Sequence, residues 1–169
     1  MIRGLVCDDH FTVRQGIKQV LADADDIVLA AEAENGPEAI RRVREAAGNE
    51  PIHVVLMDIA MPHRDGLDVL RQLRGEFPRL PVPMLSTYPD EQYAVRSPKL
   101  GAAGYLNKSA DSEQMTSAIR KVVAEQLAGA IGAEAQRAQS RREDQGILSF
   151  ALPLRSGRRQ VPYSTTTAR

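Results

Sequence analysis

The run Ile52-His53-Val54-Val55-Leu56-Met57-Asp58 sets the architecture expected for the whole chain. It is short, nearly all apolar and rich in β-branched residues, and it ends abruptly in a carboxylate. Such a run predicts a β-strand that is buried on both faces. Asp58 would then lie at the carboxyl end of the strand, where an open α/β sheet places its ligand crevice.

Short apolar runs and amphipathic stretches alternate on both sides of this strand. The predicted strands are residues 2–7, 27–33, 52–58, 82–86 and 105–107, and the predicted helices are 11–24, 37–47, 66–77, one from about 90 and one from about 111. Such alternation predicts a parallel sheet with helices on both faces. Right-handed crossovers then favour a flavodoxin-like (βα)5 doubly wound sheet with strand order 2-1-3-4-5.

Two prolines break this pattern. Pro83 falls inside a predicted strand and cannot donate to its ladder, so we expect that strand to start irregularly. Pro98 falls inside the helix predicted from about residue 90, and it would cost about 3 kcal/mol in a helix interior. We therefore expect that helix to end or kink near Arg96-Ser97.

Composition restricts the function classes. The 169 residues include 22 Lys and Arg against 22 Asp and Glu, so no overall field favours nucleic acid or a membrane surface. Cys7 is the only cysteine, which rules out an intrachain disulfide and fits a reducing compartment. Early charges argue against a signal peptide, and no apolar run approaches the roughly 20 residues of a membrane span. We expect a cytoplasmic protein of one ordinary domain with an appendage.

Polar residues end four of the predicted strands. They are the pair Asp8-Asp9, then Asp58, Ser86 and Lys108. Parallel strands bring these residues to one edge, where three neighbouring carboxylates repel one another unless a cation lies among them. All-oxygen ligands suit Mg²⁺, and with that charge in place Asp58 could act as a nucleophile on phosphorus. The lysine ammonium and the serine hydroxyl could contact the phosphoryl oxygens.

Taken together, these motifs resemble the receiver domain of bacterial two-component response regulators. The matching segments are Cys7-Asp8-Asp9-His10, Leu56-Met57-Asp58-Ile59-Ala60-Met61-Pro62, Asp65-Gly66, Leu85-Ser86-Thr87 and Gly101-Ala102-Ala103-Gly104-Tyr105-Leu106-Asn107-Lys108. Within the family, Ala102-Ala103-Gly104-Tyr105-Leu106 and a lysine without a following proline are similar to the branch that carries a LuxR-type helix-turn-helix effector.

The resemblance implies a role for each site residue. Asp58 would accept a phosphoryl group from a sensor histidine kinase. Asp8, Asp9, Asp58 and the backbone carbonyl of Ala60 would hold Mg²⁺, with Asp8 acting through bound water. Lys108, Ser86 and Tyr105 would form the phosphoryl-contact and switch set. The output face and a possible homodimer surface would be the helix predicted from about residue 90, the strand 105–107 and the helix from about residue 111. The implied output is transcription regulation.

Each residue also has a structural interpretation when it is taken alone. Asp58 could be a turn residue, and Asp8-Asp9 could cap the first helix. Tyr105 could be a half-buried strand aromatic. Cys7 and the methionines at 57, 61, 84 and 115 favour core packing. His10 could contact the site, but its setting favours a solvated loop histidine.

We expect residues 1–128 to form the receiver and residues 129–169 to form an extension of the last helix and a basic tail. Gly129 and Gly132 would each cost about 1 kcal/mol relative to alanine in such a helix. Residues 145–169 contain four arginines and no acid. No helix-turn-helix pattern follows residue 128, so the effector domain of the LuxR-type branch is not expected here. Three alternatives stay open for this segment: a solvated tail, a nonspecific DNA contact, or a shortened or altered relative of a full regulator.

Three functions compete on this basis. The first is a phosphorylated switch that controls transcription. The second is a stand-alone receiver that acts through protein contacts or as a phosphate sink without DNA binding. The third is a Mg²⁺-dependent phosphatase with an aspartyl nucleophile. Haloacid-dehalogenase-like hydrolases need a second acid two residues after the nucleophile, and Ala60 occupies that position, so we do not expect an enzyme.

Overall fold

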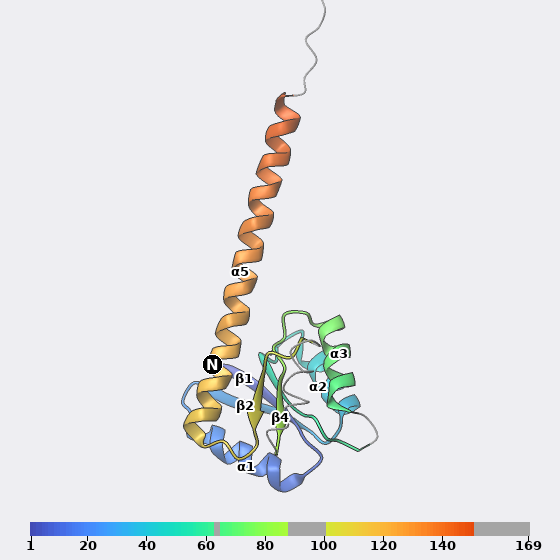
Figure 1. The fold of residues 1–169 in the computed structure, drawn as a ribbon, viewed down its shortest axis with the longest axis vertical. Coiled ribbons are helices and arrows are strands. Elements are labelled where there is room, and N and C mark those ends of the chain that lie inside the picture. The colour runs from blue at the N-terminus through green and yellow to red at the C-terminus, as the bar shows by residue number, and fades with distance from the viewer. Residues whose placement is uncertain (63–64, 88–100, 151–169) are drawn as a thin grey trace, which may run out of the picture. The chain divides into compact units, whose positions relative to one another are not determined.

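The computed structural model describes residues 1–62, 65–87 and 101–150, and side chains up to residue 137 within those ranges. Five strands form one parallel sheet in the order β2-β1-β3-β4-β5, which confirms the predicted fold (Figure 1). The strands are β1 (Ile2–Cys7), β2 (Ile27–Ala33), β3 (Val54–Asp58), β4 (Pro83–Ser86) and β5 (Gly104–Asn107). Because β3 is central and buried along its whole length, its carboxyl end opens at the middle of one sheet edge.

Helices cover both faces of the sheet (Figure 1). They are α1 (Phe11–Ala22), α2 (Gly36–Ala46), α3 (Gly66–Glu76) and α5 (Ser112–Phe150). The core on one face includes Ile40 of α2 and Leu70 of α3, and the core on the other includes Ile17 of α1 and Ile119 of α5. Burying the apolar faces of these helices against the sheet provides the main favourable contribution to folding.

Side-chain caps fix where three helices begin. Asn35 Oδ1 accepts the Glu38 N–H at 2.9 Å before α2, and Asp65 Oδ1 accepts the Leu67 N–H at 3.0 Å before α3. Asp111 Oδ1 accepts the Gln114 N–H at 2.8 Å before α5. Each bond satisfies an N–H that the helix itself leaves without a partner.

Several predicted boundaries shift by a few residues. Pro83 is the first residue of β4, a strand position where a missing N–H is tolerated, and this accounts for its presence in the sheet. Within α1, Gly16 is exposed, and Arg14 is buried beside Ile17 and Leu21. The predicted fourth helix and the effect of Pro98 fall in residues 88–100, outside the described part of the chain.

The last helix continues past the sheet-packing region. α5 runs from Ser112 to Phe150 and includes both Gly129 and Gly132. The chain divides into two compact units, Met1–Ile131 and Gly132–Arg169, so the division falls within this helix. In the second unit, residues 132–150 are helical, and the side chains described there are exposed. No helix in the described ranges combines the length and apolarity needed to cross a membrane.

Candidate functional site

The carboxyl edge of the sheet brings the predicted polar residues together. Asp8 follows β1, Asp58 ends β3, Ser86 ends β4 and Lys108 follows β5. Backbone bonds continue the ladder beyond the strands: the Asp8 N–H donates to the Ala33 carbonyl at 3.1 Å, and the Lys108 N–H donates to the Ser86 carbonyl at 2.8 Å. These bonds fix the main chain at two of the positions from which the site side chains project.

Lys108 bridges two buried carboxylates. Its Nζ lies 2.6 Å from Asp8 Oδ2 and 2.8 Å from Asp58 Oδ2. The Asp8 and Asp58 side chains are 0% and 2% exposed, and the lysine side chain is 10% exposed. The other oxygen of each acid accepts a backbone N–H, from His10 at 2.8 Å for Asp8 and from Ala60 at 3.2 Å for Asp58. The Asp58 carboxylate is therefore held in one orientation.

The charges of the site do not balance. Three carboxylates (Asp8, Asp9 and Asp58) face one ammonium. Burial raises the pKa of Asp58, and the neighbouring Asp8 raises it further, while Lys108 only partly opposes this. Burial alone would lower the pKa of Lys108, but its bonds to the two carboxylates outweigh that effect and raise it. The site thus holds excess negative charge that a cation would relieve.

The loop after β3 is held by a close backbone approach. Gly66 donates its N–H to the Ile59 carbonyl at 3.1 Å and lies directly against the end of β3. A Cβ at this position would lie 2.0 Å from the Asp58 carbonyl oxygen, far inside van der Waals contact. The Asp65-Gly66 motif therefore has two functions: the aspartate caps α3, and the glycine lets that helix begin beside Asp58.

We expect Gly66→Ala to lower the free energy of unfolding by about 1–3 kcal/mol, because the main chain at Asp58 or at α3 must move. Gly75→Ala is the matched control on the same helix, since a Cβ there meets no atom within 4 Å. That control should stabilise the protein by about 0.5–1 kcal/mol through helix propensity. Chemical denaturation of both variants tests this, and equal stabilities would contradict the close-approach argument.

Arg14 is a site-supporting residue that sequence reasoning missed. Its side chain is only 6% exposed, and its guanidinium donates to the Asp8 carbonyl at 2.8 Å and to Glu34 at 2.7 Å. It also stacks over Phe11, with 5.7 Å between its Cζ and the ring centroid. The signal was present in the sequence, because Arg14 shares helical spacing with Ile17 and Leu21. A charge on a buried stripe implies a specific partner.

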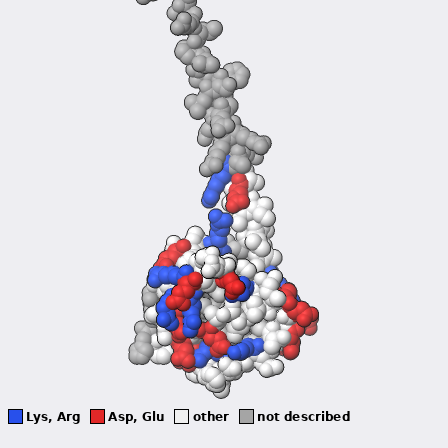
Figure 2. All heavy atoms as spheres, turned by 180° about the vertical axis from the view of Figure 1, so that it is seen from behind, with Lys and Arg blue, Asp and Glu red and all other residues white. Residues whose placement is uncertain are grey.

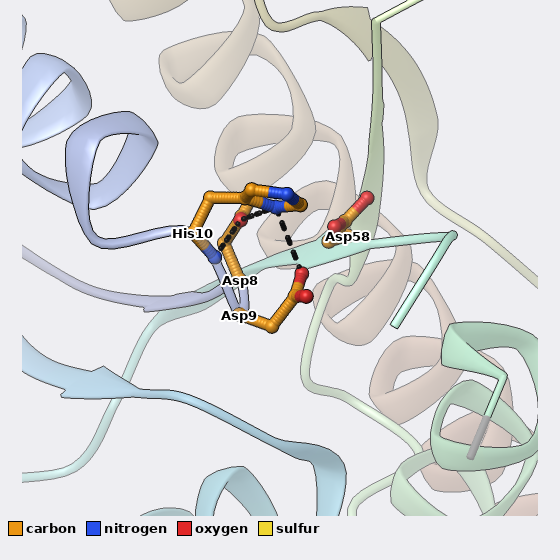
Figure 3. Close-up of side chains that lie close together, drawn as sticks. All are labelled: Asp8, Asp9, His10 and Asp58. Atoms are coloured by element: carbon orange, nitrogen blue, oxygen red, sulfur yellow. Dashed lines mark hydrogen bonds and ion pairs between the residues drawn. The ribbon is translucent and has the colours of Figure 1, made fainter. Parts of the chain in front are cut away.

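His10 is an exposed loop residue, as predicted, and its ring also approaches the acids of the site. Its Nδ1 is 3.0 Å from Asp9 Oδ1 and 3.4 Å from Asp8 Oδ1 (Figure 3). His10 is also the N-cap of α1, without a side-chain cap bond. The alternative in which Asp8-Asp9 cap α1 is therefore wrong: Asp8 accepts the N–H of His10, which precedes the helix.

The remaining predicted residues lie where the strands put them. Ser86 is half-buried at the end of β4, and Tyr105 is half-buried on β5 and packs against the core that contains Met84. Ala60 is exposed beside Asp58. Cys7 is fully buried, as predicted, and burial followed by the nearby Asp58 raises its pKa to about 12. Its thiol is therefore neutral, and it fills space in the core beneath the site.

The donor set suits a hard divalent cation. One ligand atom from each of Asp8, Asp9, His10 and Asp58 lies within 4.8 Å of the others (Figure 3). Among the described residues, the buried Asp9 Oδ1 accepts no hydrogen bond. Mg²⁺ prefers carboxylate oxygens and keeps several waters, so these residues fit it. Bound there, it would neutralise charge on the acids and on an incoming phosphoryl group.

Comparison with known proteins agrees with this geometry. Residues 5–120 match the family model described as the response regulator receiver domain. The chain is 41% identical over 126 residues to Response regulator GacA of Pseudomonas protegens, covering 75% of this chain and 57% of that protein. It is 37% identical over 115 residues to Transcriptional regulatory protein YdfI of Bacillus subtilis, covering 68% and 52%.

A solved structure gives the same result. The crystal structure of a LuxR-family two-component response regulator from Aurantimonas sp. SI85-9A1 matches with a TM-score of 0.67 and 27% identity, over 73% of this chain and 85% of that chain. The fold and the acidic edge define a two-component signalling module. The chain belongs to the response regulator receiver domain family and resembles its LuxR-type members, as predicted. It spans about half the length of the curated relatives it matches.

Proposed function

We propose that the chain is a phosphoacceptor switch that receives a phosphoryl group on Asp58 from a sensor histidine kinase, with Mg²⁺ bound at Asp8, Asp9, Asp58 and the Ala60 carbonyl. One observation carries the proposal. A buried carboxylate at the end of the central strand lies 2.8 Å from a lysine ammonium and beside two further acids. Membership of the receiver family supports the same assignment.

The proposed step is a displacement at phosphorus. A carboxylate oxygen of Asp58 forms the new P–O bond while the P–N bond of a phosphohistidine breaks, and the bonding pair leaves on the imidazole nitrogen. Bound Mg²⁺ supplies charge neutralisation for the phosphoryl oxygens. Asp58 loses its negative charge when it becomes an acyl phosphate, and Lys108 is then free to pair with a phosphoryl oxygen. Ser86 and Tyr105 would carry this local change toward β5.

We propose that this event controls transcription, acting through residues 1–128 as the receiver. A relative of the chain is named a transcriptional regulatory protein, and a matched structure is described as LuxR family. Past the receiver, the described part of the chain continues only as α5. The stand-alone alternative, which acts by protein contact or as a phosphate sink, uses the same chemistry at Asp58. Since Ala60 stands where a hydrolase of this type has its second acid, we propose signalling and not catalysis.

Surface charge supports local partner recognition. On the face that Figure 2 shows, lysine and arginine side chains are interspersed with aspartate and glutamate over the unit Met1–Ile131. Many are paired; for example, Arg44 donates to Glu76 at 2.8 and 2.6 Å. A mixed surface gives little long-range steering, so kinase choice would depend on contacts near the site. A homodimer through the predicted fourth helix, β5 and α5 would likewise depend on direct contacts and not on long-range charge attraction.

Incubation with a small phosphodonor such as acetyl phosphate tests the proposal. We expect intact-mass analysis to find one added phosphoryl group in the presence of Mg²⁺, none after chelation, and its removal by hydroxylamine, which cleaves acyl phosphates. Peptide mapping should place the group on Asp58. No uptake under any of these conditions, or uptake at another residue, would falsify the assignment.

A further inference from the structure

The imidazole of His10 faces the acidic site and not the solvent alone (Figure 3). The His10 N–H donates to Asp8 Oδ1 at 2.8 Å, and the extended backbone at His10 (φ −89°, ψ 113°) turns its ring back over the two aspartates. As a result Nδ1 lies 3.0 Å from Asp9 Oδ1, although 63% of the His10 side chain is exposed. The residue is anchored by its own main chain in a position to share a ligand with its neighbours.

The second described histidine provides a comparison. His53 Nδ1 accepts the Arg3 N–H at 3.0 Å, so that nitrogen is occupied by the fold. The His10 Nδ1, in contrast, lies against carboxylate oxygens of Asp8 and Asp9. A neutral imidazole in such surroundings presents a nitrogen lone pair where the acids present oxygen lone pairs.

The spacing suits a single ion. Metal–ligand bonds of about 2.0–2.2 Å place neighbouring ligands about 3.0 Å apart and opposite ligands about 4.2 Å apart. The Nδ1 distances to Asp9 and Asp8 are 3.0 and 3.4 Å, and the four candidate ligand atoms all lie within 4.8 Å. An ion among them could therefore take Nδ1 and Asp9 Oδ1 as neighbouring ligands.

We propose that His10 is a ligand to the metal at this site, so that the site accepts a first-row transition ion such as Mn²⁺ as well as Mg²⁺. This rests on the proposed function, which assigns the metal to Asp8, Asp9 and Asp58. Mg²⁺ takes oxygen ligands and gains little from a nitrogen ligand, whereas first-row transition ions accept imidazole, and Mn²⁺ binds it least strongly of that series. His10 thus sets the metal preference of the site, while the acids provide the binding common to both ions.

Pulsed electron paramagnetic resonance of Mn²⁺ bound to the full chain tests this directly, because a coordinated imidazole gives a ¹⁴N hyperfine coupling. We expect that coupling in the wild type and in the control His53→Gln, and its loss in His10→Phe. In titrations, His10→Phe should weaken Mn²⁺ binding about tenfold or more. Mg²⁺ affinity should remain nearly unchanged. His10→Gln, a polar second variant, should lose the same coupling.

The outcomes separate the two proposals. Mn²⁺ bound without nitrogen coupling, coupling that persists in His10→Phe, or equal losses of Mn²⁺ and Mg²⁺ affinity would each overturn the role of His10. If Asp58 still takes up a phosphoryl group in those cases, the proposed function stands. If wild-type Asp58 takes up none with Mg²⁺, the proposed function fails whatever the resonance spectrum shows.

Discussion

Asp58→Asn should abolish phosphoryl uptake completely and, without divalent ions, should make the protein more stable than the wild type at neutral pH. The loss of uptake follows from chemistry, because an amide oxygen is a poor nucleophile toward phosphorus. The gain in stability follows from electrostatics. Burial and Asp8 raise the pKa of Asp58, so its ionised form is disfavoured in the folded protein. Asparagine has nearly the same shape and carries no charge.

The pH dependence has a definite sign. A carboxyl group whose pKa is higher in the folded state contributes stability that is full below its unfolded value of 3.8 and is lost as pH rises through the folded value. Wild-type protein should therefore lose this contribution on going from acid to neutral pH, and Asp58→Asn should not. The two melting temperatures should converge at acid pH and separate as pH rises.

Melting curves in chelator across this pH range measure the effect. Asp25→Asn is a control that removes the same charge from an exposed position. It should follow the wild-type profile. Adding Mg²⁺ should stabilise the wild type and do much less for Asp58→Asn, which lacks a ligand. A variant that is less stable than the wild type at neutral pH would contradict the proposed charge excess at the site.

The fold and the meeting of the site residues were predictable for one shared reason. Each strand is a short apolar run that ends in a polar residue, and parallel strands with right-handed crossovers put all those ends on one edge. Cys7-Asp8 and Met57-Asp58 therefore lie side by side although 50 residues separate them. Asn107-Lys108 reaches the same edge from β5, and Lys108 contacts both acids.

The features that could not be predicted depend on side-chain directions and on opposing helix propensities of neighbouring residues. The helical spacing of α1 places Arg14 beside Ile17 and Leu21, but it does not identify the Asp8 carbonyl as the partner of its guanidinium. The position of His10 depends on a hydrogen bond that its main-chain N–H donates to the Asp8 carboxylate. The sequence predicts an extension of the last helix but not its end at Phe150, because Gly129 and Gly132 oppose a helix while the surrounding alanines favour one. These features are decided by side-chain contacts and by small free-energy differences, which cannot be obtained from the residue pattern alone.

Lys108→Ala should lower the free energy of unfolding by about 3–5 kcal/mol without divalent ions, because it leaves two buried carboxylates without their cation. Asp8 and Asp58 would each keep one backbone N–H, from His10 and Ala60 respectively. Lys108 also opposes the rise in the pKa of Asp58, so its removal should raise that pKa further. The variant should therefore be least stable at neutral pH and recover as pH falls.

Mg²⁺ should rescue this variant more than it stabilises the wild type, since a bound cation replaces the lost charge. Binding to the folded state alone contributes about 2.7 kcal/mol when the ion is present at 100 times its Kd. Lys121→Ala is the matched control, because it removes a lysine from an exposed position on α5 and should change stability little. Denaturant titrations of both variants, with Mg²⁺ and with chelator, measure the difference. If Lys108→Ala unfolded like Lys121→Ala in chelator, Lys108 could not be the charge that holds Asp8 and Asp58 together.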